Sequence, residues 1–154
     1  MIAWITERKS AMIVFLLILV IVGGVSILNW IRGESDSKLT PPEQGALEFW
    51  KAMNVEGDAQ KAKQLDANGD EHKAVFKNPI NKVMIMQSPE RPATDKTAKV
   101  FIYTPDDDRG YMLDMVNQNG KWKMRHYETD YGLYDYVAKY YPDHQHDWKE
   151  VNLK

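Results

Sequence analysis

The chain has 154 residues, of which 44% are hydrophobic, yet its mean hydropathy is -0.53, so the apolar residues are concentrated in one segment. Its 20 basic and 22 acidic residues give a net charge of -2, which lacks the basic excess expected of a nucleic-acid-binding protein. The absence of cysteine excludes disulfides, thiolate catalysis, sulfur-ligated zinc and a lipid-modified cysteine anchor.

Residues 11–31 are uncharged and strongly apolar, which predicts a transmembrane helix after a short N-terminal segment, residues 1–10. At about 1.5 Å per residue, such a helix crosses roughly 30 Å of hydrocarbon. Trp4 and Trp30 suit the two headgroup regions. The stretch is too long for a cleaved signal peptide and does not end in small residues, so we expect a retained anchor in the lipid bilayer.

Two basic residues flank the predicted membrane helix on each side. The free N-terminal amine adds a positive charge to the short side, so we expect the N-terminus in the cytoplasm and the following domain outside it. Gly23 and Gly24 make a notch of small residues where a second transmembrane helix could pack. A lipid-facing helix with incidental glycines is an equally good explanation.

Residues 32–39 are short, polar and mixed in charge, which is typical of a linker. The sequence Thr40-Pro41-Pro42-Glu43 then predicts the start of a helix, because a threonine N-cap, a proline and a glutamate three positions on form a capping box. An apolar stripe at helical spacing continues this helix to about Gly57. Asp58 can cap a second, shorter helix that runs to Leu65.

Four runs rich in β-branched, aromatic and methionine residues predict four strands, at residues 82–87, 97–104, 111–117 and 121–128. Asn119-Gly120 joins the last two as a two-residue hairpin turn, because both residues tolerate a positive φ. The register that follows from this turn pairs Met115 with Met124, Asp114 with Arg125 and Leu113 with His126.

This register sorts the side chains of the hairpin into two faces. The mostly apolar face, which we expect to pack against the helices, includes Met115, Trp122, Met124 and His126. On the opposite, wet face, Asp114 and Arg125 should form a cross-strand ion pair. If the space behind the sheet is hollow, the candidates for lining a ligand pocket are Trp50, Met115, Trp122, Met124 and His126.

A last helix is predicted from Asp130 and must stop at Pro142. Leu133, Val137 and Tyr140 form its inward stripe. One helix cannot bury all the tyrosines of this region, and tyrosine is enriched where proteins meet, although rings lying along the domain edge explain them equally well. The candidates for a partner-binding surface are Tyr134, Tyr136 and Tyr141.

The predicted domain, residues 40–141, is α+β, with two helices, a four-stranded antiparallel sheet and a C-terminal helix, and residues 142–154 form a polar tail. The segments PPEQGALEFWKAMNVEGDAQKAKQL and GYMLDMVNQNGKWKMRHYE resemble the nuclear transport factor two-like superfamily, which has a curved-sheet cone fold. Many bacterial members are short envelope proteins with a membrane anchor. The chain is also similar to the inner-membrane assembly factor of type IV secretion and conjugation systems. The resemblance implies a cone with an extracytoplasmic role.

Enzymes of this fold use an aspartate or histidine inside the cone, and His126 is the candidate here. The hairpin supplies no second inward carboxylate, so we expect a hydrogen-bonded histidine without a catalytic role. Residues 66–71 look like a calcium loop, but their glycine is at the fourth position instead of the sixth. His144 and His146 lack a third ligand nearby, so we expect a solvated tail, no metal site and no cofactor.

We therefore expect a non-enzymatic, membrane-tethered domain that binds another protein or a second copy of itself, as an assembly or accessory subunit of an envelope complex. A small-ligand-binding cone is the first alternative, and it requires a hollow behind the sheet. An enzyme that uses His126 is the second alternative. The sequence gives no reason to expect a nucleic-acid partner.

Overall fold

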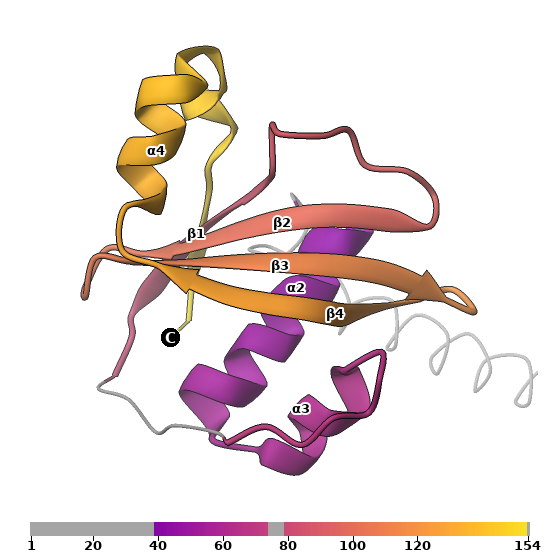
Figure 1. Ribbon diagram of the computed structural model, residues 1–154. Helices are drawn as coiled ribbons and strands as arrows, with labels where there is room; N and C mark the ends of the chain where they lie inside the picture. The colour runs from indigo at the N-terminus through magenta and orange to yellow at the C-terminus, as the bar shows by residue number, and fades with distance from the viewer. Residues whose placement is uncertain (1–38, 74–78, 154) are drawn as a thin grey trace, which may run out of the picture. The chain divides into compact units, whose positions relative to one another are not determined.

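The computed structural model describes residues 39–73 and 79–153 of the chain (Figure 1). The described residues belong to one compact unit. The predicted transmembrane helix at residues 11–31, its two glycines and most of the predicted linker lie outside them. No helix in the described part of the chain is long and apolar enough to cross a membrane.

The described domain is α+β, with helices at both ends of a run of antiparallel strands. In chain order its elements are α2 (Pro41–Lys51), the π-helix η1 (Ala52–Glu56), α3 (Ala59–Leu65), β1 (Lys82–Gln87), β2 (Thr97–Thr104), β3 (Arg109–Gln118), β4 (Lys121–Asp130), α4 (Leu133–Tyr140), the 3-10 helix η2 (Pro142–Asp147) and β5 (Lys149–Asn152).

The predicted start and end of the first helix are confirmed. The Thr40 amide donates a hydrogen bond to Glu43 Oε2 over 2.7 Å, which is the glutamate half of the capping box. After η1, Gly57 has a φ of 65°, a left-handed conformation that glycine adopts without a steric penalty. The Asp58 side chain then accepts a hydrogen bond from the Lys61 amide and caps α3.

The sheet has five strands in the order β4-β3-β2-β1-β5, one more than the sequence predicts. The extra strand, β5, lies in the segment predicted as a polar tail and pairs with β1, with Val151 opposite Val83. Val151 and the preceding Trp148 are both buried. The sequence of β5 contains a single apolar residue, so its alternation is too short to be recognised without the neighbouring strand.

The inner face of the sheet packs against α2, which crosses behind the strands in Figure 1. The Trp50 ring of α2 lies edge-on to the Tyr111 ring of β3, with 5.7 Å between the ring centroids. Met115 and Met124 belong to the same hydrophobic core and are 0% and 2% exposed. The side chains of α2 and the strands therefore occupy this side of the sheet.

A β-bulge in β4 changes the predicted hairpin register. Met115 still pairs with Met124, but Asp114 lies opposite His126. Arg125 is therefore an extra residue in β4 that has no partner residue in β3. Side chains beyond Arg125 consequently change faces. Tyr127 turns inward, toward Tyr111. The prediction that His126 faces the helices is wrong, because its side chain is 60% exposed. The predicted pairs Asp114–Arg125 and Leu113–His126 are also wrong, because Asp114 lies opposite His126 and Leu113 lies opposite Tyr127.

The outer face of the sheet is partly covered by α4 and η2. Leu133 and Val137 are buried there, as predicted, in a cluster with Phe101 of β2. The prediction that Tyr140 faces inward is wrong, because its side chain is 59% exposed. The reason is that α4 ends at Tyr140, and Tyr141, with a φ of -135°, leaves the helical path and packs on this cluster in its place.

Candidate partner-binding surface

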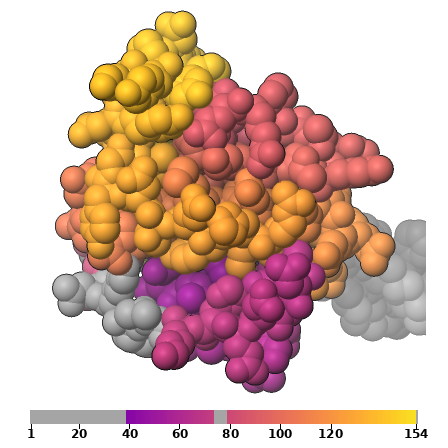
Figure 2. All heavy atoms as spheres, viewed as in Figure 1, coloured from indigo at the N-terminus to yellow at the C-terminus, as the bar shows by residue number. Residues whose placement is uncertain are grey.

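Near the β3–β4 turn, no described helix packs on the outer face of the sheet. Figure 2 looks onto this side, where atoms of β3 and β4 lie between α4 on one flank and the loop of residues 88–96 on the other. We call this region the open face. Its residues are Thr97, Lys99, Asp114, Val116, Lys123, Arg125, His126 and Glu128.

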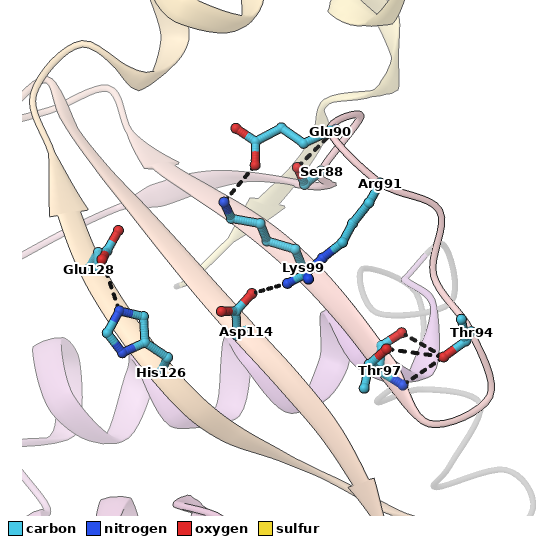
Figure 3. Close-up of polar contacts among 9 residues, drawn as sticks. All are labelled: Ser88, Glu90, Arg91, Thr94, Thr97, Lys99, Asp114, His126 and Glu128. Atoms are coloured by element: carbon cyan, nitrogen blue, oxygen red, sulfur yellow. Dashed lines mark hydrogen bonds and ion pairs between the residues drawn. The ribbon is translucent and has the colours of Figure 1, made fainter.

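The 88–96 loop is fixed at both ends by hydrogen bonds to its own residues and to β2. At one end, the Ser88 amide donates to the Lys99 carbonyl over 2.8 Å, and Ser88 Oγ accepts from the Glu90 amide over 3.2 Å. At the other end, Thr94 Oγ1 accepts from the Thr97 amide over 2.9 Å. This anchoring holds the side chains of Glu90 and Arg91 beside the open face (Figure 3).

Glu90 connects the loop, the sheet and α4. Lys99 Nζ lies 2.5 Å from its Oε2 atom, and the Tyr136 hydroxyl donates to its Oε1 atom over 3.0 Å. Partial burial alone would raise the pKa of Glu90, but the hydrogen bonds from Lys99 and Tyr136 outweigh this effect and hold the pKa below its usual value. Glu90 is therefore a charged link at the border of the open face.

The lowered pKa of Glu90 predicts that its pairing stabilises the fold above pH 4.5, the ordinary value, and that this contribution is lost as the pH falls through the lower folded-state pKa. We expect Glu90→Gln to reduce the free energy of unfolding near neutral pH and to flatten its decline in acid. Urea unfolding of the full-length protein across this pH range measures both effects. Glu150→Gln, at the more exposed pair with Lys82, is the matched control, and equal pH slopes in the two variants would contradict the prediction.

The two carboxylates of the open face, Asp114 and Glu128, also have partners. Arg91 Nη2 donates to Asp114 Oδ1 over 2.7 Å, and His126 Nε2 lies 2.8 Å from Glu128 Oε1 (Figure 3). The side chains of His126 and Glu128 are 60% and 55% exposed, so this pair lies in solvent. His126 is thus placed on the outer side of the sheet, away from the interior where a cone enzyme would need it.

The aromatic side chains of α4 reach the border of the open face through Tyr136, whose hydroxyl donates to Glu90. The Tyr136 and Tyr140 rings lie 5.2 Å apart, and Lys139 Nζ lies 5.0 Å from the Tyr140 ring centroid. Tyr134, Tyr136 and Tyr141, the predicted partner-surface residues, are half-buried, and Tyr134 stacks on Tyr103. In the described residues, the large hydrophobic side chains that are exposed belong to Tyr131 and Tyr140.

The predicted ligand-pocket residues do not share either of two hollows found among residues 39–73 and 79–153. Trp122 is half-buried and lines a surface hollow of about 490 Å³ between the β3–β4 turn and the helices. Trp50, Met115 and Met124 lie in the core and do not line this hollow. A pocket role for these residues therefore stays a prediction.

A second hollow, of about 570 Å³, lies between the start of α2, the loop after β1 and the segment that leads into β5. Within it, Lys149 Nζ lies 2.8 and 2.6 Å from the two carboxylate oxygens of Glu43, which is 1% exposed. His144 and His146 both contact Asp147, at 2.7 and 3.3 Å. No group of three or more potential metal ligands occurs among the described residues.

No protein-family model matches this chain, and comparisons with curated proteins and with solved structures gave no match. The resemblance to the nuclear transport factor two-like superfamily, and to the secretion-system assembly factor, therefore stays a prediction. A function must be argued from the surfaces themselves, because a fold alone does not specify one.

Proposed function

We propose that this chain is a single-pass membrane protein with a cytoplasmic N-terminus, and that its extracytoplasmic domain binds a protein partner as an assembly or accessory subunit of an envelope complex. The membrane part of the proposal rests on the uncharged segment at residues 11–31. The binding part rests on the open face. Its single main support is that, in the described residues, α4 and η2 pack on only part of the outer face of the sheet.

The open face has features that favour binding. Lys99 and Asp114 of the open face are already held by ion pairs with Glu90 and Arg91 of the loop, so fewer of their rotamers remain to be restricted when a partner docks. Half-buried Val116 provides an apolar centre between these charges. Tyr140, whose ring lies 5.2 Å from that of Tyr136, is exposed and is of a residue type enriched among the energetically dominant contacts of interfaces.

The size of the surface indicates which elements take part. Three strands at a spacing of about 4.8 Å, over about five residues each, offer roughly 250 Å² in projection. A stable interface covers roughly 800 Å² on each partner, which is more than the strands provide. The 88–96 loop and the Tyr140 edge of α4 should therefore contact the same partner.

Site-specific photo-crosslinking in intact cells tests this proposal. We expect a photoreactive amino acid at Val116 or Tyr140 of the full-length protein to give one discrete crosslinked product. The same group at Gln60, an exposed position of α3 on the helix side of the domain, should give none. Recovery of the uncrosslinked monomer from all three positions would contradict protein binding, and release of the protein from membranes without detergent would contradict the anchor.

Binding of a small ligand is the second candidate, and one observation favours it. The 570 Å³ hollow beside Glu43 falls within the range of about 300–1,000 Å³ typical of ligand pockets. Because Glu43, Lys149 and Arg91 line it, its ligand would be polar and charged. A small polar metabolite that raises the melting temperature of the full-length protein at saturating concentration would support this role.

A further inference from the structure

We infer that the partner segment bound at the open face is acidic and lies across Lys123, Arg125 and Arg91. This inference rests on the proposed protein-binding function and adds the chemistry of the partner to it.

The basic residues of β4 differ from those of the other strands. Each basic side chain of β1, β2, β3 and β5 lies within 4 Å of a carboxylate, in the pairs Lys82–Glu150, Lys99–Glu90, Arg109–Asp107 and Lys149–Glu43. In contrast, Lys121, Lys123 and Arg125 of β4 form no ion pair with any described residue. The open face itself holds three basic side chains, Lys99, Lys123 and Arg125, against two acidic ones, Asp114 and Glu128, on a chain whose net charge is -2. The two basic side chains of this face without an ion pair in the described residues are Lys123 and Arg125.

The bulge creates part of this excess. It places Arg125 beside His126 on the outer side, between the inward-facing Met124 and Tyr127. The carboxylate that a regular register would give to Arg125 belongs to Asp114, and Arg91 already binds it. Arg125 is consequently presented on the open face without a carboxylate of its own.

Arg91 can contribute to the same site. Its side chain is 55% exposed, and one of its guanidinium nitrogens bonds to Asp114. A guanidinium has five N–H donors and can bind a carboxylate through two parallel hydrogen bonds. Arg91 and Arg125 thus give the open face two groups suited to the carboxylates of aspartate or glutamate. Lys123, opposite Val116, adds a third positive charge at the margin of this face, where it is half-buried and also lines the 490 Å³ hollow.

Protection of a free sheet edge is the competing explanation for the unpaired basic residues of β4, because lysines on an edge strand discourage pairing with other chains. This part of the β4 edge is already covered, however. The Ala67 amide donates to the Met124 carbonyl over 2.7 Å, and Asn68 Nδ2 donates to the Arg125 carbonyl over 3.4 Å. Edge protection therefore does not require the charges of Lys123 and Arg125.

The test measures binding of a fluorescent oligoglutamate peptide to the full-length protein in nanodiscs of uncharged phosphatidylcholine. The matched peptide has glutamine in place of glutamate. We expect only the glutamate peptide to bind, and its affinity to fall at least about tenfold when salt is raised from about 50 to about 300 mM, because exposed charges are screened. The Lys123→Glu/Arg125→Glu variant should lose binding to a similar extent.

The matched control is Lys51→Glu/Lys73→Glu, which makes the same change in net charge at residues of α2 and of the segment after α3, neither of which is ion-paired among the described residues. It should retain the affinity of the unmodified protein. Equal losses in the two double variants would overturn the inference, as would aggregation of Lys123→Glu/Arg125→Glu with unchanged binding. Urea unfolding of each variant verifies that the fold is kept.

Two further outcomes would overturn it in distinguishable ways. One outcome is that nanodiscs carrying Lys123→Glu/Arg125→Glu no longer attach to vesicles containing anionic phosphatidylglycerol but still bind the peptide normally. The face would then recognise a lipid surface. If crosslinking from Val116 persists unchanged in Lys123→Glu/Arg125→Glu and at high salt, protein binding stands and the acidic partner is wrong. Absence of any crosslink from Val116 would instead count against the proposed function itself.

Discussion

Replacing Lys149 with methionine should lower the free energy of unfolding by about 2 to 3 kcal/mol, because it leaves a buried carboxylate without its cation. Glu43 is 1% exposed, and both of its oxygens lie within 2.8 Å of Lys149 Nζ. The Lys149 side chain is 30% exposed, so water screens part of the interaction and the loss should fall at or below the lower end of the range for fully buried pairs. Urea unfolding of the full-length protein in detergent, followed by tryptophan fluorescence, measures it.

Two further variants separate the ion pair from the loss of the lysine side chain. Glu43→Gln/Lys149→Met should recover part of the stability, because glutamine removes the unpaired charge and can still accept the Thr40 amide hydrogen bond. Lys82→Met, at the exposed Lys82–Glu150 pair, should cost about 0.5 kcal/mol or less. If Lys149→Met costs no more than Lys82→Met, the pair does not hold β5 to the start of α2.

Glu43 illustrates what could be predicted from the sequence and what could not. Its role in the capping box follows from a four-residue pattern, so it is predictable. Its pairing with Lys149 joins residues 106 positions apart, and no local pattern encodes that contact. The helix start, the four longer strands and the Asn119-Gly120 turn were predictable for the same reason, since each depends on neighbours in the chain.

The bulge shows how a tertiary contact overrides a local rule. The turn fixes the register from Gln118–Lys121 to Met115–Met124, and this part is confirmed. Beyond it, Tyr127 faces the core, with its ring 5.7 Å from Phe49. Burial raises the pKa of Tyr127 to about 12, against the effect of a hydrogen bond with Asn54.

One sequence signal for the bulge was present. Two consecutive polar residues, Arg125 and His126, separate the apolar Met124 from the aromatic Tyr127, and this spacing breaks the alternation of a regular strand. No comparable pattern in the sequence indicated that the side chains of Glu90 and Arg91 lie beside the open face. They reach the open face through a loop whose path is set by its hydrogen bonds to β2.

Replacing Gly110 with alanine should lower the free energy of unfolding by about 3 kcal/mol, at the upper end of the cost of overpacking a core. Gly110 lies in β3 opposite Tyr103, directly beneath the start of α4. A Cβ atom at this position would collide with Leu133 Cβ and lie 2.7 Å from the Asp130 carbonyl oxygen. Backbone and Cβ atoms cannot rotate away, so α4 must lift from the sheet to admit the methyl group.

Gly132→Ala is the matched control, because a Cβ atom there would meet only Asp130 Oδ1, at 3.9 Å. Its cost should stay within about 1 kcal/mol, the usual cost of an altered N-cap. In Gly110→Ala, separation of α4 from the sheet should also expose Met86 and Phe101, which increased binding of an apolar dye would detect. Equal stability of the two variants would mean that α4 does not pack this closely, and the boundary of the open face would then not be set by α4.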